Sequence, residues 1–256
     1  MNIAAERAIR FICERYSEPL SLDDIAGSAI MSRFHFCRIF ANATGVTPGR
    51  FLSAIRIYEA KRMLLNTAMN VTDITFAVGF NSLGSFSNHF TDSVGIAPGR
   101  FRRVARTGAL GLQPTPMGSP YADSTVTGMI TFPKGHAGAR VFLGAFDTPI
   151  VQRQPAAAVI VEPADTSEPV FFRLAGVPQG RWHLRAVAVA DSSDPEPWTR
   201  RTLLIGGCGL NVVGDVRCAP IEVRPKQPTD LPILLALPEL ESPLAEEPAL
   251  LSRSLI

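Results

Sequence analysis

An internal repeat across residues 20–101 sets the strongest limit on the fold. Phe-His-Phe-Cys-Arg-Ile-Phe at Phe34–Phe40 returns as Ser-Phe-Ser-Asn-His-Phe at Ser85–Phe90. Thr-Pro-Gly-Arg-Phe at Thr47–Phe51 returns as Ala-Pro-Gly-Arg-Phe at Ala97–Phe101. The matched apolar positions are Ile25 with Ile74, Phe36 with Phe86, Phe40 with Phe90 and Phe51 with Phe101, offset by 49 residues at the first pair and 50 at the others. A repeat of this length indicates one supersecondary unit used twice.

Capping signals mark where the helices of these units begin. Ser21–Asp24 forms a capping box, in which the hydroxyl and the acidic residue three positions later satisfy free N–H groups. Ser32 caps the next helix, and Thr47 before Pro48 gives an N-cap followed by proline at the first helical position. Ile3–Tyr16 adds an amphipathic packing helix in front. The N-terminal part therefore predicts an all-α bundle of about seven helices.

A long helix is expected between the two units. It runs from Pro48 to about Leu65, which at 1.5 Å per residue is roughly 25–30 Å. This approaches the roughly 34 Å between adjacent major-groove faces on one side of B-DNA. Each unit reads as helix-turn-helix, with Ser32–Ala43 and Leu83–Val94 as the second helices. A rod of this length can hold both second helices in successive major grooves.

The second unit also ends in a specific pattern. It reads Val78-Gly79-Phe80, then Ser85–Phe90, then Gly95–Arg102. Together with the repeat and its spacing, this pattern makes residues 2–105 resemble the DNA-binding domain of AraC/XylS-family transcription regulators. The family carries two helix-turn-helix units joined by a long helix. The resemblance implies a transcription regulator that binds double-stranded DNA and works with RNA polymerase.

The same resemblance implies which side chains face DNA. They are Ser32, Arg33, Phe34, Cys37 and Arg38 in the first unit, Ser82, Leu83, Ser85, Asn88 and His89 in the second, and Arg100, Arg102 and Arg103 as basic support beyond it. Arg38 can bind guanine O6 and N7 together, Phe34 can touch a thymine methyl, and Asn88 can pair with adenine. The alternative is that Phe34 belongs to the core and Arg38 contacts only phosphate.

The chain departs from the family after each second helix. Family members often carry Lys or Arg there, whereas this chain has Ala41-Asn42-Ala43 and Thr91-Asp92-Ser93. Gly84 inside the second recognition helix offers no side chain and costs up to about 1 kcal/mol against alanine. Fewer phosphate contacts lower general affinity and flatten the salt dependence. We therefore expect modest affinity, with the second unit the weaker reader.

Charge and proline divide the chain near residue 107. Residues 1–107 hold 13 Lys+Arg against 8 Asp+Glu, a net charge of +5, and residues 108–256 hold 12 against 15, a net charge of −3. A basic half beside an acidic half indicates nucleic acid as the partner of the first half alone. Only Pro19, Pro48 and Pro98 precede residue 108. The proline-rich second half cannot be largely helical.

The second half has the pattern of an all-β sandwich of about seven strands. Short alternating or apolar stretches follow one another, separated by Pro, Gly and Asp. The expected strands are Val126–Phe132, Ala139–Phe146, Ala157–Val161, Val170–Leu174, Leu184–Ala190, Leu203–Ile205, Ile221–Val223 and Leu231–Leu237.

One stretch of the second half is more specific. Phe171–Ala186 resembles the strand–turn–strand signature of carboxypeptidase-regulatory-like, or transthyretin-like, domains. Val126–Ile130 and Ala139–Leu143 resemble the opening strands of those domains. In this interpretation Pro178-Gln179-Gly180 makes a tight turn, and Trp182 and Leu184 reach the core on one face.

These patterns divide the chain into four parts. Residues 1–107 are the expected AraC-type DNA-binding domain, and residues 122–238 are the expected β-sandwich, with a sensing or docking role. Residues 108–121, rich in Gly, Pro and Thr, form a linker by composition. Residues 239–256 are expected to be a frayed, acidic tail. Few contacts are expected between the two domains across such a linker.

No catalytic set is expected. His35, His89, His136 and His183 are scattered, without the spacing of a metal site, so we expect no enzyme activity, no cofactor and no metal. The four cysteines also lack metal or redox spacing and are interpreted as reduced thiols, with a Cys208–Cys218 bridge as the less favoured alternative. Neither a signal peptide nor a membrane-spanning apolar run is apparent, which favours a cytoplasmic location and no membrane partner.

Two hypotheses remain for the sandwich. In the leading one, it senses an unknown small-molecule or protein effector and modulates DNA binding. In the alternative, it is a protein-docking or dimerisation module without a small-molecule ligand. A cavity lined by convergent polar groups would favour the first, and a flat apolar patch or an exposed edge strand would favour the second.

Overall fold

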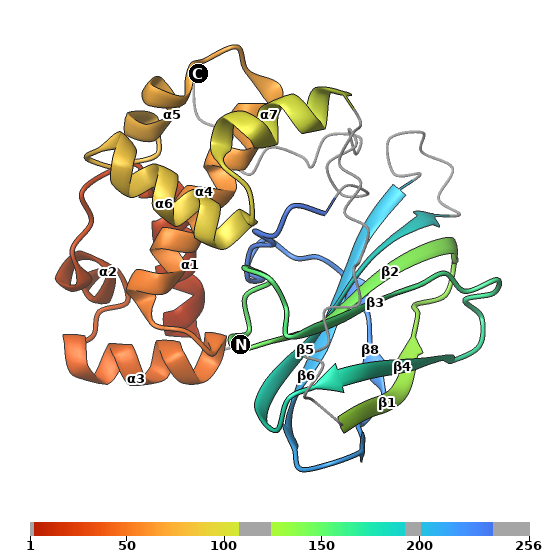
Figure 1. Cartoon of the computed structure of the whole chain (residues 1–256). Coiled ribbons are helices and arrows are strands. Elements are labelled where there is room, and N and C mark those ends of the chain that lie inside the picture. Colours follow the sequence, from red (N-terminus) through yellow and green to blue (C-terminus); the bar gives the residue numbers. More distant parts are fainter. Residues whose placement is uncertain (1–2, 108–123, 193–200, 238–256) are drawn as a thin grey trace.

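The computed structural model describes residues 3–107, 124–192 and 201–237 and places a helical part before a β-rich part (Figure 1). The predicted fold class, seven helices and then a two-sheet β region, is confirmed. The helices are α1 (Ile3–Arg15), α2 (Leu22–Ser28), α3 (Arg33–Thr44), α4 (Pro48–Asn66), α5 (Val71–Ala77), α6 (Leu83–Val94) and α7 (Pro98–Thr107). The strands are β1 (Ser124–Thr131), β2 (His136–Phe146), β3 (Ala157–Val161), β4 (Val170–Val177), β5 (Gly180–Ser192), β6 (Arg201–Val212), β7 (Val216–Arg217), β8 (Ile221–Glu222) and β9 (Arg224–Pro225).

Side-chain caps start the helices where the sequence predicts them. Ser21 Oγ accepts a hydrogen bond from the Asp24 N–H at 3.2 Å, and the Asp24 carboxylate accepts one from the Ser21 N–H at 2.8 Å. Thr47 caps α4 by accepting a hydrogen bond from the Arg50 N–H, and Asn70 caps α5 by accepting one from the Asp73 N–H. These bonds satisfy N–H groups that have no partner inside the helix. They fix the residue at which the chain enters each unit.

Helix α4 joins the two units. Its 19 residues make it about 28 Å long, and it ends one residue beyond the predicted end at Leu65. It contacts α1, α2 and α3 on the side of the first unit and α5, α6 and α7 on the side of the second. Both units are therefore packed against one rigid element.

A row of three buried phenylalanines holds each unit together. The rows are Phe36–Phe40–Phe51, with ring centroids 5.4 and 5.5 Å apart, and Phe86–Phe90–Phe101, with ring centroids 5.6 and 5.7 Å apart. All six rings are fully buried and meet in tilted or edge-on arrangements, which their quadrupoles favour. The repeat in the sequence is therefore a repeat in the core.

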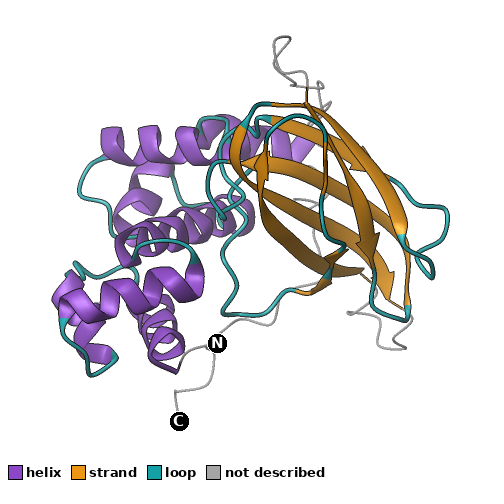
Figure 2. Cartoon of the chain, turned by 90° about the horizontal axis from the view of Figure 1, so that it is seen from below, coloured by secondary structure: helices purple, strands orange, loops and turns teal. Residues whose placement is uncertain are grey.

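The β-rich part consists of two sheets, seen as two layers of strands in Figure 2. One sheet has the order β4-β1-β7, with β8 also paired to β1, and the other has the order β3-β2-β5-β6-β9. The predicted turn at Pro178–Gly180 links β4 to β5 and therefore carries the chain from one sheet to the other. Trp182 Nε1 donates to the Pro178 carbonyl at 2.6 Å, and Leu184 is fully buried between the sheets.

The five-stranded sheet is apolar on both faces. Leu184, Ala186 and Ala188 of β5 belong to the core between the sheets. Val187, one position out of phase, lies on the opposite face in a second cluster with Phe146. Side chains alternate across a strand, so this outer face needs its own cover. Two loops supply it, residues 147–153 and 229–237, which we call the interdomain segments.

The predicted strand at Leu231–Leu237 is wrong. In the structure this stretch makes only an isolated parallel bridge between Val151 and Ile233. Its backbone bonds are divided between the two halves of the chain, because the Leu234 N–H donates to the Val151 carbonyl at 2.8 Å and the Ala236 N–H donates to the Val94 carbonyl at 3.1 Å. The apolar run packs against the outer face of the five-stranded sheet and against the helical core at the same time, instead of pairing as a strand within one sheet.

The strand at Leu203–Ile205 is longer than predicted. It continues as β6 through Gly206, Gly207 and Gly209 to Val212 and pairs with β5 along its whole length. The predicted strand stopped at Ile205 because the glycines that follow it disfavour a strand. Here close approach requires one of them, since a Cβ at Gly206 would lie 2.5 Å from the Glu222 carbonyl oxygen.

The two parts of the chain share a core. Ile150, Leu234 and Ala236 of the interdomain segments are buried in the same cluster as the helical phenylalanines. The Arg153 N–H donates to the Ser93 carbonyl at 2.8 Å. Lys61 of α4 is buried, and its Nζ donates to the Leu235 carbonyl at 3.2 Å. This contact is more extensive than the sequence-based expectation of few contacts across a linker.

Several predictions fall outside the described residues. The expected linker at 108–121 and the expected tail at 239–256 both do so, and the four-part division of the chain stays a prediction. Within the described ranges, no helix is both long and apolar enough to cross a membrane.

Candidate nucleic-acid interface

Helix α3 presents one face to solvent and buries the other. Phe36 and Phe40 point into the core, and Gly45 ends the helix in the left-handed conformation at φ 77°. Ser32 stands at the N-cap but makes no side-chain capping bond. The predicted DNA-facing residues Ser32, Arg33, Phe34 and Arg38 are exposed, and Cys37 is half-buried.

Phe34 is a surface residue. Its side chain is 81% exposed, so the alternative in which it belongs to the core does not hold. The Arg33 guanidinium carbon lies 5.1 Å from the centre of the Phe34 ring. An exposed aromatic ring of this kind on a recognition helix is available to a thymine methyl.

Arg38 lies one turn further along the same face. Its Nη2 is 3.4 Å from His35 Nδ1 on the preceding turn. Arg33, by contrast, lies 3.8 Å from the Asp23 carboxylate of α2, a long and exposed pairing that holds it only weakly. Arg38 is therefore the arginine of α3 whose guanidinium is not engaged by a carboxylate of the described residues.

Helix α6 repeats this arrangement with different chemistry. Ser82 caps it by accepting a hydrogen bond from the Ser85 N–H at 3.3 Å, and Phe86 and Phe90 are buried. Leu83, Ser85, Asn88 and His89 are exposed, as predicted for a DNA-facing set. The His89 ring lies against Phe80, with centroids 5.9 Å apart. This face carries no Lys or Arg.

The arginines of α7 differ from one another. Arg100 and Arg103 are exposed. Arg102 turns back into the protein, where its Nε donates to the Leu64 carbonyl at 3.1 Å and its Nη2 to the Met69 carbonyl at 2.6 Å. These bonds satisfy carbonyls at the end of α4 and in the turn before α5. In this geometry Arg102 braces the fold, whereas the other two face solvent.

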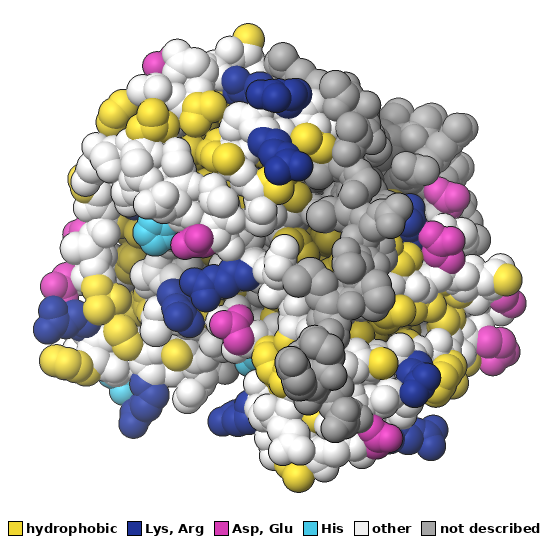
Figure 3. Space-filling view, viewed as in Figure 1, with side chains coloured by type: hydrophobic (Ala, Val, Ile, Leu, Met, Phe, Trp, Pro, Cys, Tyr) yellow, Lys and Arg dark blue, Asp and Glu magenta, His cyan; other side chains and the backbone are white. Residues whose placement is uncertain are grey.

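Basic side chains on the helical part do not form one continuous patch. On the face drawn in Figure 3, dark blue side chains form separate groups over α3, near the middle of the face and over α7, with uncharged surface and a few acidic side chains between the groups. Asp92, near the end of α6, is exposed. The basic side chains on this face are therefore interrupted by uncharged and acidic ones.

Comparison with known proteins identifies the helical part. Residues 25–104 match the family model described as a helix-turn-helix domain. The lactose operon transcription activator of Staphylococcus xylosus is 29% identical over 102 residues, which cover 40% of this chain and 37% of that protein. The transcriptional regulator Rob of Salmonella typhimurium is 32% identical over 97 residues, covering 38% and 34%.

The N-terminal region is an AraC-family helix-turn-helix DNA-binding domain. This chain spans about a third of the length of the curated relatives that it matches. A crystal structure of an AraC-type transcriptional regulator from Chromobacterium violaceum is 29% identical to this chain in the matched region. The match covers 40% of this chain and 90% of that one, with a TM-score of 0.38.

Sequence reasoning placed the exposed faces of the AraC-family domain but missed its internal braces. Arg56 of α4 is half-buried, and it donates to the Tyr16 and Glu18 carbonyls, each at 2.7 Å. Gly79 lies against the same turn, and a Cβ there would stand 2.7 Å from the Ser17 carbonyl oxygen. No sequence pattern distinguishes these basic residues, because only the folded chain separates those that face solvent from those that bond to carbonyls.

Proposed function

We propose that this chain is a sequence-specific transcription regulator that reads two adjacent major-groove segments of DNA with α3 and α6. The observation that carries the proposal is the repeated geometry of those two helices. Each begins at an exposed serine, presents an exposed polar face and packs its phenylalanines against the elements around α4. Helix-turn-helix proteins place such a face in the major groove.

Within this proposal, Arg38 and Asn88 are the principal base readers. An exposed arginine suits guanine and an exposed asparagine suits adenine. Phe34, Cys37, Ser85 and His89 contribute apolar or polar contacts to base edges. Arg33, Arg100 and Arg103 contact phosphates, which position the domain without reading sequence. RNA polymerase is the proposed protein partner, and no cofactor or catalytic activity is part of the function.

The β-rich part is proposed to modulate DNA binding. Support comes from its contacts with the C-terminal ends of both recognition helices. A Cβ at Gly45, which ends α3, would lie 2.9 Å from Pro149, and a Cβ at Gly95, which ends α6, would lie 3.8 Å from Leu235. A shift of either interdomain segment therefore bears directly on a recognition helix. The likeness of this part to transthyretin-like domains is retained as a hypothesis.

A docking role for the β-rich part is the second candidate. It is favoured by Phe171, which is 60% exposed on β4, a strand at the edge of its sheet. An exposed edge strand with an aromatic side chain can pair with another chain.

Genomic footprinting with the purified chain tests the proposed function. The expected result is a set of sites that share a motif in two blocks, with centres about 10 base pairs apart, since each block is one turn of DNA from the next. Chain carrying Arg38→Ala together with Asn88→Ala is the control and is expected to lose the motif while keeping weak binding. Enrichment without a shared motif, or with a single block, would contradict the proposal.

A further inference from the structure

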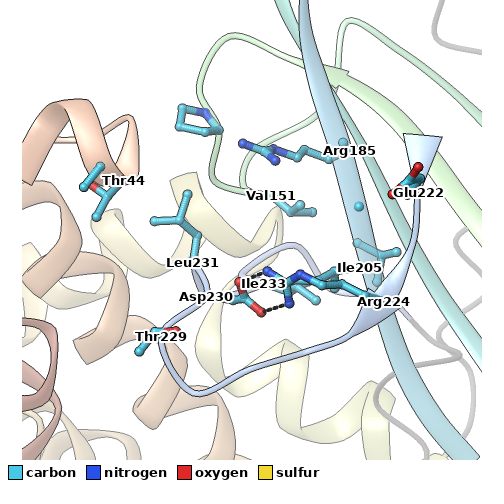
Figure 4. Close-up of a pocket in the computed structure, with 16 residues that line it drawn as sticks. Thr44, Val151, Arg185, Ile205, Glu222, Arg224, Thr229, Asp230, Leu231 and Ile233 are labelled. Carbon is cyan, nitrogen blue, oxygen red and sulfur yellow. Dashed lines mark hydrogen bonds and ion pairs between the residues drawn. The ribbon is translucent and has the colours of Figure 1, made fainter. Parts of the chain in front are cut away.

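A cavity of about 380 Å³ lies between the five-stranded sheet and the end of α3 (Figure 4). This volume is within the range of about 300–1,000 Å³ that ligand pockets occupy. Its apolar walls include Val151, Val187, Ile205 and Ile233, all from the cluster that covers the outer face of the sheet. Thr44, the last residue of α3, lines the opposite side.

Arg185 supplies an unusual polar group to this cavity. It stands on β5 between Leu184 and Ala186, which face the core, so its side chain leaves the sheet on the outer face. It pairs across the sheet with Gly207. A Cβ at Gly207 would clash first with the Leu184 carbonyl oxygen and would also lie 2.9 Å from Arg185 Cδ and 3.0 Å from an Arg185 terminal nitrogen, so the glycine leaves room for both the backbone and the Arg185 side chain. In Figure 4 this guanidinium points away from the sheet, toward the side where Thr44 lies.

The Arg185 guanidinium forms no ion pair with a described residue, although Asp230 acts on its charge from a distance. Its Nε is buried and has no hydrogen-bond partner among the described residues. Burial lowers the pKa of Arg185, yet an arginine remains charged at neutral pH. A buried charged donor without a partner is destabilising, so this nitrogen favours a ligand that can accept its hydrogen bond.

The acidic groups around the cavity do not supply that acceptor. Asp230 accepts two hydrogen bonds from Arg224, at 2.6 and 2.8 Å, and one from the Gln227 N–H at 2.6 Å. Burial tends to raise the pKa of Asp230, but these bonds outweigh it and hold the pKa below its usual value. Glu222 also lines the cavity, and Figure 4 shows the Arg185 guanidinium extending away from it.

The end of α3 carries a partial negative charge, which opposes an anion. This dipole effect is small, and the Gly45 N–H and the Thr44 hydroxyl already cap the nearby Ala41 and Phe40 carbonyls. A hydrogen bond from a charged donor to an anion is stronger than this dipole effect. The guanidinium therefore decides the preference of the cavity.

We propose that this cavity binds a small organic carboxylate with an apolar body. The carboxylate accepts hydrogen bonds from the Arg185 guanidinium, which suits the planar fork of that group. The apolar body lies on Val187, Ile205 and Ile233. A small anion alone would leave the apolar walls without contact, and an apolar molecule alone would leave the buried Arg185 Nε without an acceptor.

The consequence for regulation rests on the proposed function. A ligand in this cavity touches β5, the interdomain segments and the end of α3 together. It therefore favours one placement of the recognition helix over others by its differential affinity for them. The binding of the carboxylate itself does not depend on DNA.

Calorimetric titration of the full chain, without DNA, tests the site. The probes are hexanoate and phenylacetate, each against its uncharged amide, with acetate and sulfate as anions that lack an apolar body. We expect one molecule of either larger carboxylate to bind per chain, and at least tenfold weaker binding of the amides and the small anions. Arg185→Met should weaken carboxylate binding at least tenfold, and Arg185→Lys should weaken it less. Arg173→Met, which removes an exposed arginine of the other sheet, should leave it unchanged.

Equal binding of acid and amide, unchanged binding to the Arg185→Met chain, or no heat from either carboxylate would overturn the proposal. If the Arg185→Met chain does not fold, as judged by its thermal melt, the amide and Arg185→Lys comparisons decide instead. DNA affinity with and without the bound carboxylate is then measured separately. Carboxylate binding without any change in DNA affinity would support the site and contradict the proposed modulation.

Discussion

The arginines of the AraC-family domain divide by what their guanidinium groups contact. Arg56 and Arg102 donate to backbone carbonyls, one in the turn before α2 and the other at the end of α4 and in the turn before α5. In each unit, the turn before the first helix is therefore bound by an arginine of the helix that follows the unit. Arg56 of α4 binds the turn before α2, and Arg102 of α7 binds the turn before α5. Arg38 and Arg100 face solvent instead. Arg38 and Arg100 are therefore available to DNA, whereas the guanidinium groups of Arg56 and Arg102 are not.

Arg38 is expected to read a base. Arg38→Ala should weaken binding to the specific site by about 1–3 kcal/mol and relax the preference at one base pair. Arg33→Ala, on the same helix, is the control and should weaken binding to specific and random duplexes alike. Fluorescence anisotropy on both duplexes at one salt concentration measures this. An equal loss for Arg38→Ala on the two duplexes would make Arg38 a phosphate contact.

Arg102 and Arg100 are expected to differ although they are two residues apart. Arg102→Ala should lower the free energy of unfolding by about 1–3 kcal/mol, since it leaves two carbonyls without their donors. Arg100→Ala should leave stability unchanged and reduce the slope of log affinity against log salt by about 1. Urea unfolding and salt titrations of both variants measure the two effects. The reverse pattern would assign the phosphate contact to Arg102.

The thiols of Cys208 and Cys218 are hydrogen-bonded to each other at the core between the two sheets, and neither forms a disulfide. The bond from Cys218 lowers the pKa of Cys208, against the opposing effect of burial. Burial, with Glu59 nearby, raises the pKa of Cys13 to about 11. The thiolate is the reactive form. The sequence-based alternative of a Cys208–Cys218 bridge is therefore not the state in this structure.

Alkylation should follow these pKa values. Iodoacetamide at about pH 7.5 should modify Cys208 well before Cys13, and the Cys208 rate should fall about tenfold per pH unit once the pH lies below the lowered pKa of Cys208. Cys218→Ala removes the bond that lowers the pKa and should slow Cys208 at the same pH. Peptide mass spectrometry over time measures the rates. Faster modification of Cys13 than of Cys208 would contradict the assignment.

At the scale of elements, the two recognition helices share a frame and differ in surface chemistry. Both are twelve residues long, begin at a serine and end at a left-handed glycine. Helix α3 carries Arg33 and Arg38, whereas α6 carries no Lys or Arg and has Asp92 in its last turn. Coulombic attraction to phosphate supplies a large share of protein–DNA affinity. The two recognition helices therefore share a fold but are expected to differ in the strength with which they bind DNA.

The half-site under α3 is expected to matter more than the half-site under α6. Randomising the first should weaken binding by at least about 1.4 kcal/mol more, a tenfold difference. The reason is that α3 can grip guanine and neutralise phosphate, while α6 depends on neutral hydrogen bonds. Titrations on two half-randomised duplexes at fixed salt measure the difference. Equal losses, or a larger loss at the second half-site, would make Asn88 and Ser85 the principal readers.

At the scale of the whole molecule, the β-rich part completes the core of the helical part. Ile150, Leu234 and Ala236 are buried among helical residues, and Lys61 donates to the Leu235 carbonyl. The helical part nevertheless has its own core in the two phenylalanine rows. Its fold is therefore expected to survive separation, at reduced stability.

A fragment of residues 1–107 tests this expectation. It should fold and bind DNA, but with a free energy of unfolding lower by on the order of 3 kcal/mol, because Ile150 and Leu234 no longer cover its surface. Thermal melts by circular dichroism, beside DNA titrations, measure both properties. Full chain carrying Leu234→Ala is the control and should fall between the two. An unfolded fragment would place the domain boundary wrongly, and an equal melt would mean that the contact adds no stability.

The sequence alone determined the elements that depend on local chemistry. Caps at Ser21 and Thr47 placed helix starts, the phenylalanine repeat placed the core of both units, and α6 was predicted at its observed bounds. The exposed faces of α3 and α6 came from the resemblance to AraC/XylS-family domains, whose motifs are themselves local patterns in the chain. These features depend on residues close together in the chain, so pattern and propensity are sufficient to find them.

Only the tertiary structure decided what distant residues do together. The run at 231–237 looks like a strand by its apolar residues, yet it lies between a sheet and a helical core because both surfaces need cover. Arg102 looks like its neighbour Arg100 in the sequence, yet it braces α4 because its turn of helix brings it to free carbonyls. Arg185 meets Gly207 and Thr44 in one cavity only through strand pairing and contact between the two halves of the chain. Such meetings depend on long-range packing, which no local pattern in the chain records.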